Sequence, residues 1–227
     1  MDKALSWLAN TLDYRFDDER LFEQALTHRS SPGASNERLE FLGDAVLDFA
    51  VSEVVYSAMP EADEGDLSRL RASLVKDTSL AELAAGLGLG EHLILGSGER
   101  KSGGHRRESI LADALEALFG AVFLDAGYDA SRKIIEKSFG DRLLELPDPR
   151  DLRDPKTRLQ EWLQARALGL PDYELANVSG EAHRQEFEVR CTVSGGQFQT
   201  SGDGRSRRNA EQAAAERMLT VLGESEQ

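Results

Sequence analysis

The spacing of apolar residues is helical along the first part of this chain and becomes alternating only after a segment rich in proline. Residues 146–155, LPDPRDLRDP, place three prolines among charged residues, a composition that stops helices and resists packing. Before this segment the apolar residues recur at helical spacing, whereas after it a helical stretch gives way to alternation. Because 227 residues suffice for two modest cores, we predict domains over residues 1–147 and 156–224, joined by a linker over residues 148–155.

The first predicted domain is all-α. Its apolar residues follow helical spacing in five segments, and none of the domain alternates convincingly as a strand would. The expected helices lie near residues 17–28, 36–58, 64–88, 107–125 and 129–146.

The second predicted domain is a small α+β unit with the order α-β-β-β-α. Asp154 and Pro155 form a helix cap followed by a proline at the first helical position, ahead of the amphipathic KTRLQEWLQARAL. Three alternating stretches follow, YELANVS, QEFEVRCTV and GQFQTSG, and the alanine-rich RRNAEQAAAERMLTVL ends the domain as a helix. Cys191, the single cysteine, falls on the inward side of the middle strand, so we expect a buried, inert thiol.

An acidic stripe runs along the helix expected over residues 36–58. At about 100° per residue, one side of NERLEFLGDAVLDFA is acidic and the opposite side is apolar. The acidic side carries Glu37, Glu40, Asp44 and Asp48, and the apolar side carries Leu39, Leu42, Val46 and Phe49. A solvated helix usually places Lys or Arg four residues away, but here Glu40 is followed by Asp44, and Asp44 by Asp48. Two like-charge pairs therefore lack a basic neighbour along the helix.

The helix expected over residues 107–125 repeats this arrangement. Asp113 and Glu116 stand three residues apart, opposite Leu111, Leu115, Leu118 and Val122. Carboxylates gathered without basic partners suit a hard divalent ion, and Mg²⁺ typically uses a few of them while keeping several waters. Spacing alone also fits two solvated acidic faces, because acidic helix surfaces are common. Both interpretations are open at this point.

The net charge of −14 argues at first sight against a nucleic-acid partner, because proteins that bind phosphate backbones usually carry basic surfaces. The charge is unevenly distributed, however. Residues 1–147 hold 16 basic and 27 acidic residues, a net of −11, whereas residues 148–227 hold 11 and 14, a net of −3. The second part is thus close to neutral, and its local basic clusters are compatible with binding of a polyanionic partner.

Several classes of function find no support in the sequence. GSGERKSGG, residues 96–104, has no glycine directly before Lys101, so it fails the phosphate-loop pattern, and GLGLG, residues 86–90, lacks the third glycine of a dinucleotide site. No apolar run approaches the ~20 residues that span a bilayer, and the chain does not open with a basic region followed by an apolar one. We expect a cytoplasmic protein with no organic cofactor and no membrane partner.

Long motifs connect the chain with a known family. NERLEFLGDAVL resembles the signature of the bacterial ribonuclease III family, and HRRESILADALEALFGAVFLDAGY resembles its second acidic helix. QALTHRS, EGDLSRLRASLV and the C-terminal domain are also similar, so the resemblance covers nearly the whole chain. It implies a metal-dependent endoribonuclease that hydrolyses double-stranded RNA to 5′-phosphate and 3′-hydroxyl ends, processing ribosomal RNA precursors and structured RNAs.

The same resemblance assigns roles to the acidic residues. Glu40, Asp113 and Glu116 match metal ligands, with Mg²⁺ as the expected ion and Mn²⁺ as a substitute, and Asp44 and Glu116 match the residues most essential for hydrolysis. Glu37 and Glu64 match supporting acids, whereas Asp48 matches no assigned role. The nuclease domain of the family is a homodimer. Phe41, an apolar residue close to the acidic stripe, is expected at the dimer interface, although a tilted core position fits its spacing too.

The second domain resembles a double-stranded-RNA-binding domain, which reads the shape of A-form RNA across two minor grooves. The match places Thr157, Gln160 and Glu161 at one minor groove and His183 at the next. Arg207 and Arg208 match residues that meet phosphates at a helix N-terminus. Asn209 departs from the family, which commonly has a further Lys or Arg there, so phosphate affinity is expected to be weaker.

Two other functions compete with the enzymatic one. A non-catalytic binder of double-stranded RNA would keep the fold for dimerisation, but it gains nothing from uncompensated carboxylates facing phosphate. A metal-dependent hydrolase of small phosphorylated substrates would leave the second domain unexplained. The complete set of Glu40, Asp44, Asp113 and Glu116 favours the nuclease.

Overall fold

The computed structural model describes residues 1–181 and 184–223, without the side chain of Ser194, and divides into two compact units, Met1–Pro149 and Arg150–Gln227. Each unit is treated separately below. Among the described residues, no helix combines the length and the apolar character needed to cross a membrane.

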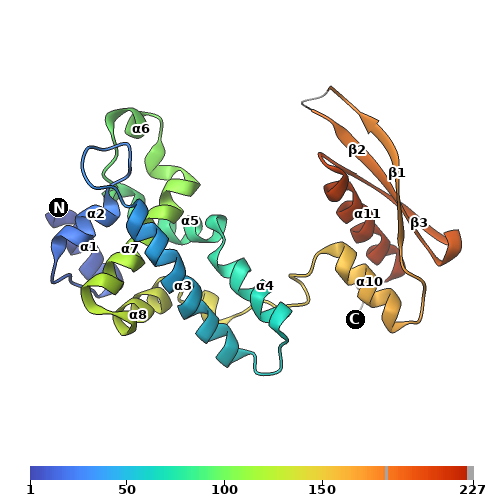
Figure 1. Cartoon of the computed structure of the whole chain (residues 1–227), viewed down its shortest axis with the longest axis horizontal. Coiled ribbons are helices and arrows are strands. Elements are labelled where there is room, and N and C mark those ends of the chain that lie inside the picture. The colour runs from blue at the N-terminus through green and yellow to red at the C-terminus, as the bar shows by residue number, and fades with distance from the viewer. Residues whose placement is uncertain (182–183, 224–227) are drawn as a thin grey trace. The chain divides into compact units, whose positions relative to one another are not determined.

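The first unit is built from helices, as predicted (Figure 1). Its α-helices are α1 (Asp2–Leu12), α2 (Glu19–Leu26), α3 (Glu37–Ala58), α4 (Glu64–Val75), α5 (Asp77–Gly86), α6 (Ser97–Lys101), α7 (Glu108–Ala126), α8 (Tyr128–Phe139) and α9 (Asp141–Leu144), with short 3-10 helices at Leu89–His92 and Gly104–Arg106. Extended pairing within the unit is limited, in the described residues, to an isolated parallel bridge between Thr27 and Ile94.

Helix α7 forms the centre of this unit. Three consecutive residues, Ala117, Leu118 and Phe119, are fully buried, which requires neighbours on all sides of the helix. The side predicted to face inward is buried as expected: Leu111, Leu115, Leu118 and Val122. The acidic residues of α7 therefore stand on a helix that packing holds in place.

Helices α3 and α7 cross where glycines replace side chains. A Cβ added to Gly43 of α3 would overlap the carbonyl oxygen of Glu116, and one added to Gly120 of α7 would overlap the carbonyl oxygen of Leu39. The two backbones thus touch at both positions, which is closer than helices carrying larger side chains can approach. The carboxylates that flank the crossing are brought together by this contact.

The predicted helices and the observed ones differ at several places. The segment expected as one helix over residues 129–146 is divided into α8 and α9, because Gly140 between them has a positive φ of 52°, and the short helix α6 was not predicted. The segment expected as one helix over residues 64–88 is two helices, because Lys76 is extended (φ −61°, ψ 148°) and α5 begins anew at Asp77. Helix α1 was not predicted. Its Leu8 and Leu12 are buried, and Trp7 Nε1 donates a hydrogen bond to the carbonyl oxygen of Leu87 at 2.7 Å.

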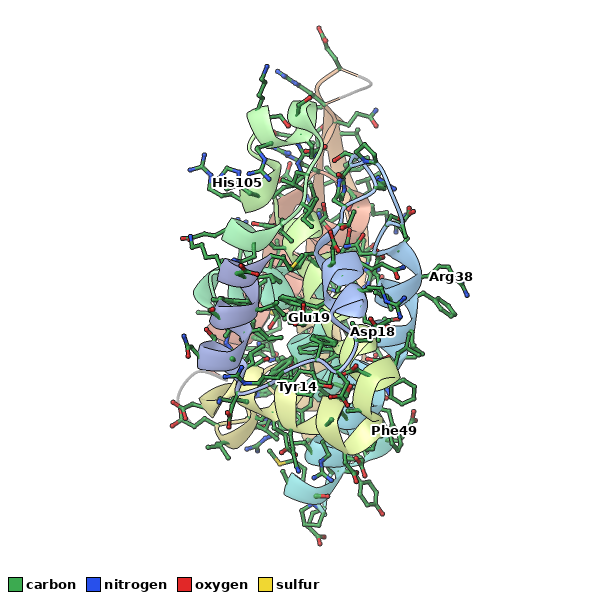
Figure 2. All side chains as sticks on the ribbon, turned by 90° about the vertical axis from the view of Figure 1, so that its left-hand side faces the viewer. Tyr14, Asp18, Glu19, Arg38, Phe49 and His105 are labelled. Carbon is green, nitrogen blue, oxygen red and sulfur yellow. The ribbon has the colours of Figure 1, made fainter. Side chains whose placement is uncertain are left out.

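Phe49 lies outside the core, and the prediction that placed it inside is wrong. Leu39 and Val46 are buried as expected, but Phe49 is 56% exposed, and Figure 2 shows its ring directed outward at the edge of the unit. Ten residues separate it from Leu39, so it points about 80° away around the helix. Its ring instead contacts Tyr128, with 5.1 Å between the ring centroids.

The second unit has the predicted α-β-β-β-α order. Helix α10 (Pro155–Ala165) precedes an antiparallel sheet of β1 (Asp172–Ser179), β2 (Glu186–Val193) and β3 (Phe198–Gly204), with a 3-10 turn at Ser194–Gly196 before β3, and α11 (Arg207–Leu222) ends the unit. Figure 1 shows α10 and α11 on one side of the sheet. Between them and the sheet lies a core that includes Leu163, Cys191 and Met218. Burial raises the pKa of the Cys191 thiol, which confirms a buried cysteine that stays protonated.

Candidate active site

A tethered loop forms the edge of the acidic site. The amide of Gly96 donates to Ser30 Oγ at 3.0 Å, which fixes the loop before α3 against the segment that follows α5. This holds Arg29 beside the first turn of α3, where its Nη1 lies 3.6 Å from Glu37 Oε1. A cation thus stands at one end of the acidic stripe.

Three carboxylates converge at the crossing of α3 and α7. Glu40 from α3 and Asp113 and Glu116 from α7 each offer one oxygen, and these oxygens all lie within 4.8 Å of one another. Each of the three side chains is half-buried. The helical spacing of the sequence placed each acid on its helix, and the glycine contact between the helices places the two sets together.

The carboxylates at this crossing repel one another in a partly desolvated setting. Burial and, after it, the nearby charges of Asp44 and Glu40 raise the pKa of Glu116 to about 8. Burial also raises the pKa values of Glu40, Asp44 and Asp113, with a neighbouring carboxylate as the second cause in each case. The four carboxyl groups therefore resist being ionised all at once unless a positive charge is added among them.

The outer acids of the stripe have basic partners that the inner ones lack. Glu37 pairs with Arg29, and Asp48 Oδ1 lies 3.9 Å from Arg71 Nε. Within the described part of the chain, Glu40, Asp44, Asp113 and Glu116 form no ion pair. The sequence pattern could not show the two outer partners, since Arg29 and Arg71 come from other elements. The inner four have no ion-pair partner among the described residues, although the charge of Arg29 partly offsets the rise in the pKa values of Glu40 and Asp113. Oxygen donors of this kind match a hard divalent cation.

Glu64 does not lie with this group. It begins α4 and lines a surface cavity with Phe49 and Tyr56 of α3. At about 1.5 Å of rise per residue, these residues lie roughly 13–24 Å along α3 from Glu40. Within one subunit the supporting acids predicted from the sequence are therefore separated, with Glu37 one turn before Glu40 and Glu64 far from both.

Asp77 is a neighbour of the site that the sequence did not reveal. Its charge raises the pKa values of both Asp113 and Glu116, because α5 packs against α7 and begins at this residue. The preceding residues give no acidic periodicity that could have identified it, and its proximity arises from the helix break at Lys76.

An exposed apolar surface follows α3 beside the acidic stripe. Phe41 is 81% exposed, and Phe49 and Tyr56 are 56% and 73% exposed. Three large rings on one helix are unusual on the surface of a monomer. The core position considered for Phe41 is wrong.

The predicted RNA-contacting residues of the second unit gather near the N-termini of α10 and α11. Thr157, Gln160 and Arg208 line one groove of 540 Å³. Thr157 Oγ1 donates to Asp154 at 2.7 Å, which fixes its side chain at the start of α10. Glu161 is exposed and pairs with Arg153.

The two arginines at the start of α11 differ in their partners. Arg207 Nε donates to Glu211 Oε1 at 2.9 Å, and Arg208 lines the groove next to α10. Both guanidinium groups are exposed. His183, the remaining predicted contact, lies outside the described residues.

A helical unit with a carboxylate cluster, joined to an α-β-β-β-α unit with arginines at a helix N-terminus, defines a nuclease equipped to hold duplex RNA. A ribonuclease-III-like family model matches residues 18–143, and a double-stranded RNA binding motif matches residues 155–222. The chain belongs to the ribonuclease III family and is a double-stranded-RNA endoribonuclease.

Relatives resemble the chain over nearly its full length. Ribonuclease 3 of Nitrosococcus oceani is 54% identical over 98% of this chain and 96% of its own, and that of Vibrio cholerae is 49% identical over 98% and 99%. The solved nuclease domain of ribonuclease III from Campylobacter jejuni, described for flexibility in a region involved in dimer formation, is 45% identical. It covers 60% of this chain and 98% of its own, with a TM-score of 0.57.

Proposed function

We propose that this enzyme needs a divalent metal ion, Mg²⁺ in the cell with Mn²⁺ as a substitute, and that its products carry 5′-phosphate and 3′-hydroxyl ends. The observation that carries the proposal is the convergence of Glu40, Asp113 and Glu116, none of which forms an ion pair with a residue that the structure describes. A purely solvated acidic surface would keep its carboxylates apart, because their repulsion has nothing to offset it.

Glu40, Asp113 and Glu116 are the residues that would hold the ion. A divalent cation bound there supplies a Lewis acid for the phosphodiester and a water molecule of lowered pKa. Glu116 has to release its proton before it can bind, since its pKa of about 8 keeps much of it neutral at pH 7. We assign Asp44 to orient the attacking water, because its carboxylate lies close enough to raise the pKa of Glu116 and forms no ion pair with a described residue.

The RNA-binding role belongs to the second unit. We assign residues 1–147 to catalysis, residues 148–155 to a linker and residues 156–224 to duplex binding. Thr157, Gln160 and Glu161 would face one minor groove and His183 the next, while Arg207 and Arg208 bind the intervening phosphates. Such contacts read duplex shape rather than sequence, as an enzyme that processes ribosomal RNA precursors and structured messenger RNA in the cytoplasm requires.

The nuclease unit acts as a homodimer. Phe41, Phe49 and Tyr56 supply an exposed apolar surface that a second copy would cover. Glu64 lines the cavity beside Phe49 and Tyr56, far from Glu40 of its own subunit. It can therefore support catalysis only at the active site of the partner subunit. Phe41→Asp should therefore shift the protein to a monomer in sedimentation experiments and reduce cleavage.

A cleavage assay tests the proposed function. Purified protein is incubated with a long RNA duplex and with the matching single strand, each with Mg²⁺ and with chelator. Only the duplex with Mg²⁺ should be cut, and end-labelling should find 5′-phosphates. Binding of the duplex without cleavage under every metal condition would identify a non-catalytic binder instead.

A further inference from the structure

The first turn of α10 is completed by a side chain from α11. Pro155 has no amide hydrogen, so two backbone amides of this turn, those of Lys156 and Thr157, need acceptors outside the regular helix bonds. Asp154 accepts from the amide of Thr157 at 3.2 Å, as a capping residue does. The amide of Lys156 donates instead to Oε1 of Gln212 at 3.1 Å. A residue 56 positions further along the chain therefore finishes the cap of α10.

Both ends of the Gln212 amide are used in this way. Its Nε2 donates to Asp154 Oδ1 at 2.9 Å, while its Oε1 accepts from Lys156. Although burial raises it, the pKa of Asp154 is lowered overall, because Thr157 and Gln212 donate to the carboxylate. A glutamine held at both its oxygen and its nitrogen has a single orientation, so α11 is fixed to the start of α10 at this point.

Gln212 lies among the residues to which we assign contacts with RNA. It lines the groove of 540 Å³ together with Thr157 and Gln160 of α10 and Arg208 of α11. Arg208 and Gln212 are four residues apart, so they lie on the same side of α11. The side chain that joins the two helices thus stands one turn after Arg208, against the first turn of α10.

We propose that Gln212 is a positioning residue for duplex recognition, which holds the minor-groove contacts of α10 in register with the phosphate contacts of α11. The proposal rests on the RNA-binding role of the second unit. An RNA duplex presents its 2′-hydroxyls in the minor groove and its phosphates beside that groove, at a spacing fixed by the A-form helix. Both can be bound at once only when the starts of α10 and α11 keep a matching separation. Gln212 acts on the RNA through Thr157 and Gln160 rather than by contact.

Duplex binding by the full-length variant Gln212→Leu tests the proposal. Affinity is measured in chelator, to prevent cleavage, for an RNA duplex and for a DNA duplex of the same sequence, at salt low enough for both to bind. Leucine is similar in size but makes neither hydrogen bond, so α10 loses its fixed register. The variant should bind RNA about fivefold more weakly and DNA no more weakly than the parent, because only RNA has 2′-hydroxyls for α10 to contact. Its plot of log affinity against log salt should keep the parent's slope, because no phosphate contact is removed.

Gln212→Glu separates positioning from a general loss of stability. Its carboxylate can still accept from Lys156, but it faces the carboxylate of Asp154 instead of donating to it. At neutral pH this variant should bind RNA at least as weakly as Gln212→Leu. A proton on the new side chain restores the donor, so its affinity relative to that of the parent should recover as the pH falls towards about 5. Gln212→Leu should show no such recovery, because it has no proton to gain.

Gln164→Leu is the matched control. Gln164 is an exposed glutamine on the same helix, α10, and its side chain makes no hydrogen bond to a residue that the structure describes. This variant removes an amide without altering the cap, so it should bind both duplexes as the parent does.

The remaining outcomes would overturn the proposal. Normal RNA binding by Gln212→Leu would show that the register of α10 does not depend on Gln212. Equal losses for RNA and DNA, or a flatter salt plot, would mean that Gln212 acts on phosphate binding or on folding instead.

Gln160→Ala tests the RNA-binding role on which the proposal rests. If Gln160→Ala lowers the preference for RNA over DNA while Gln212→Leu does not, the positioning role fails and the minor-groove assignment of α10 stands. If Gln160→Ala leaves that preference unchanged, the minor-groove assignment fails, and the positioning role fails with it.

Discussion

The carbonyl oxygen of Glu116 occupies the space where Gly43 would carry a side chain. A Gly→Ala change inside a helix ordinarily stabilises by about 0.5–1 kcal/mol, but here the added methyl would force α3 away from α7. We predict that Gly43→Ala lowers the free energy of unfolding by about 2 kcal/mol or more and abolishes cleavage. Chemical denaturation and the duplex assay measure the two effects.

Gly86→Ala is the control for this change. Gly86 ends α5, and a Cβ added there meets nothing within 4 Å. This variant should fold and cleave normally. Full activity in Gly43→Ala would show that the acids can be positioned without the close crossing.

Glu116→Gln should abolish cleavage, preserve duplex binding and leave the metal-free protein equally or more stable at pH 8. Two unit charges ~4 Å apart repel by about 4 kcal/mol at an effective dielectric of ~20, so even a hydrated carboxylate cluster opposes folding. Mg²⁺ should raise the melting temperature of the parent protein more than that of the variant, because a ligand stabilises the state that binds it. Glu108→Gln, at the exposed start of α7, should change none of these properties.

Both melts are made at fixed ionic strength. A cleaving Glu116→Gln protein would remove Glu116 from the active site. An inactive one whose metal-free stability falls sharply would make Glu116 a structural partner instead.

The metal-free protein should lose stability as the pH rises through 8. The folded-state pKa of Glu116 is raised from 4.5 to about 8, so its contribution is fully present below pH 4.5 and is lost as the pH passes the higher value. Solvent screening limits the effect to about 1–2 kcal/mol. Denaturation at pH 5, 7 and 8.5 should show this decline, and the Glu116→Gln protein should lack it.

Mg²⁺ affinity should rise with pH as Glu116 ionises, whereas the stability of the metal-free protein falls. Because the ion requires an ionised Glu116, Mg²⁺ affinity should increase up to about tenfold per pH unit below pH 8, with release of a proton. Calorimetry in buffers of different ionisation enthalpy counts that proton. Binding without proton release at pH 7 would mean that Glu116 is already ionised.

Arg207→Ala with Arg208→Ala should weaken binding of unrelated duplexes by a similar factor. Phosphate contacts fix position and carry no base information, so discrimination between sequences should stay the same. Competition binding with several duplexes measures this directly. A loss confined to certain sequences would show that these arginines contact bases.

Removal of residues 150–227 should leave a folded dimer that cuts duplex at low salt and high enzyme concentration. The first unit forms its own core, and a solved nuclease domain resembles it over 98% of that domain's length. Duplex binding should be weaker and less dependent on salt, since the cations at the start of α11 are gone. A folded dimer that never cuts would show that catalysis needs the second unit.

Local signals in the sequence predicted much of the fold. The cap at Asp154 and the alternating strands set the order of the second unit, and the apolar side of α7 is buried where its leucines indicated. Phe49 was misplaced because residues at regular spacing gradually turn around a long helix such as α3. An apolar stripe that faces the core at Leu39 therefore no longer faces it at Phe49.

The site depends on contacts that no local pattern contains. Periodicity placed Glu40 and Glu116 on their helices, but Gly43 alone gave no sign that the helices touch there. Likewise Arg29 and Asp77 reach the site from separate elements, so their influence on the carboxylates follows from tertiary packing.

Glu211 limits how strongly the RNA-binding unit can bind phosphate through Arg207. One of its oxygens accepts from Lys156 of α10 at 2.6 Å and the other from Arg207 of α11 at 2.9 Å. A phosphate that takes Arg207 away from this acid exchanges one ion pair for another, so the encounter gains less than it would from an unpaired cation. A nuclease must release the cut pieces before it can act again, and departure of products often limits turnover. We therefore expect the Glu211–Arg207 ion pair to shorten the residence of the enzyme on one duplex.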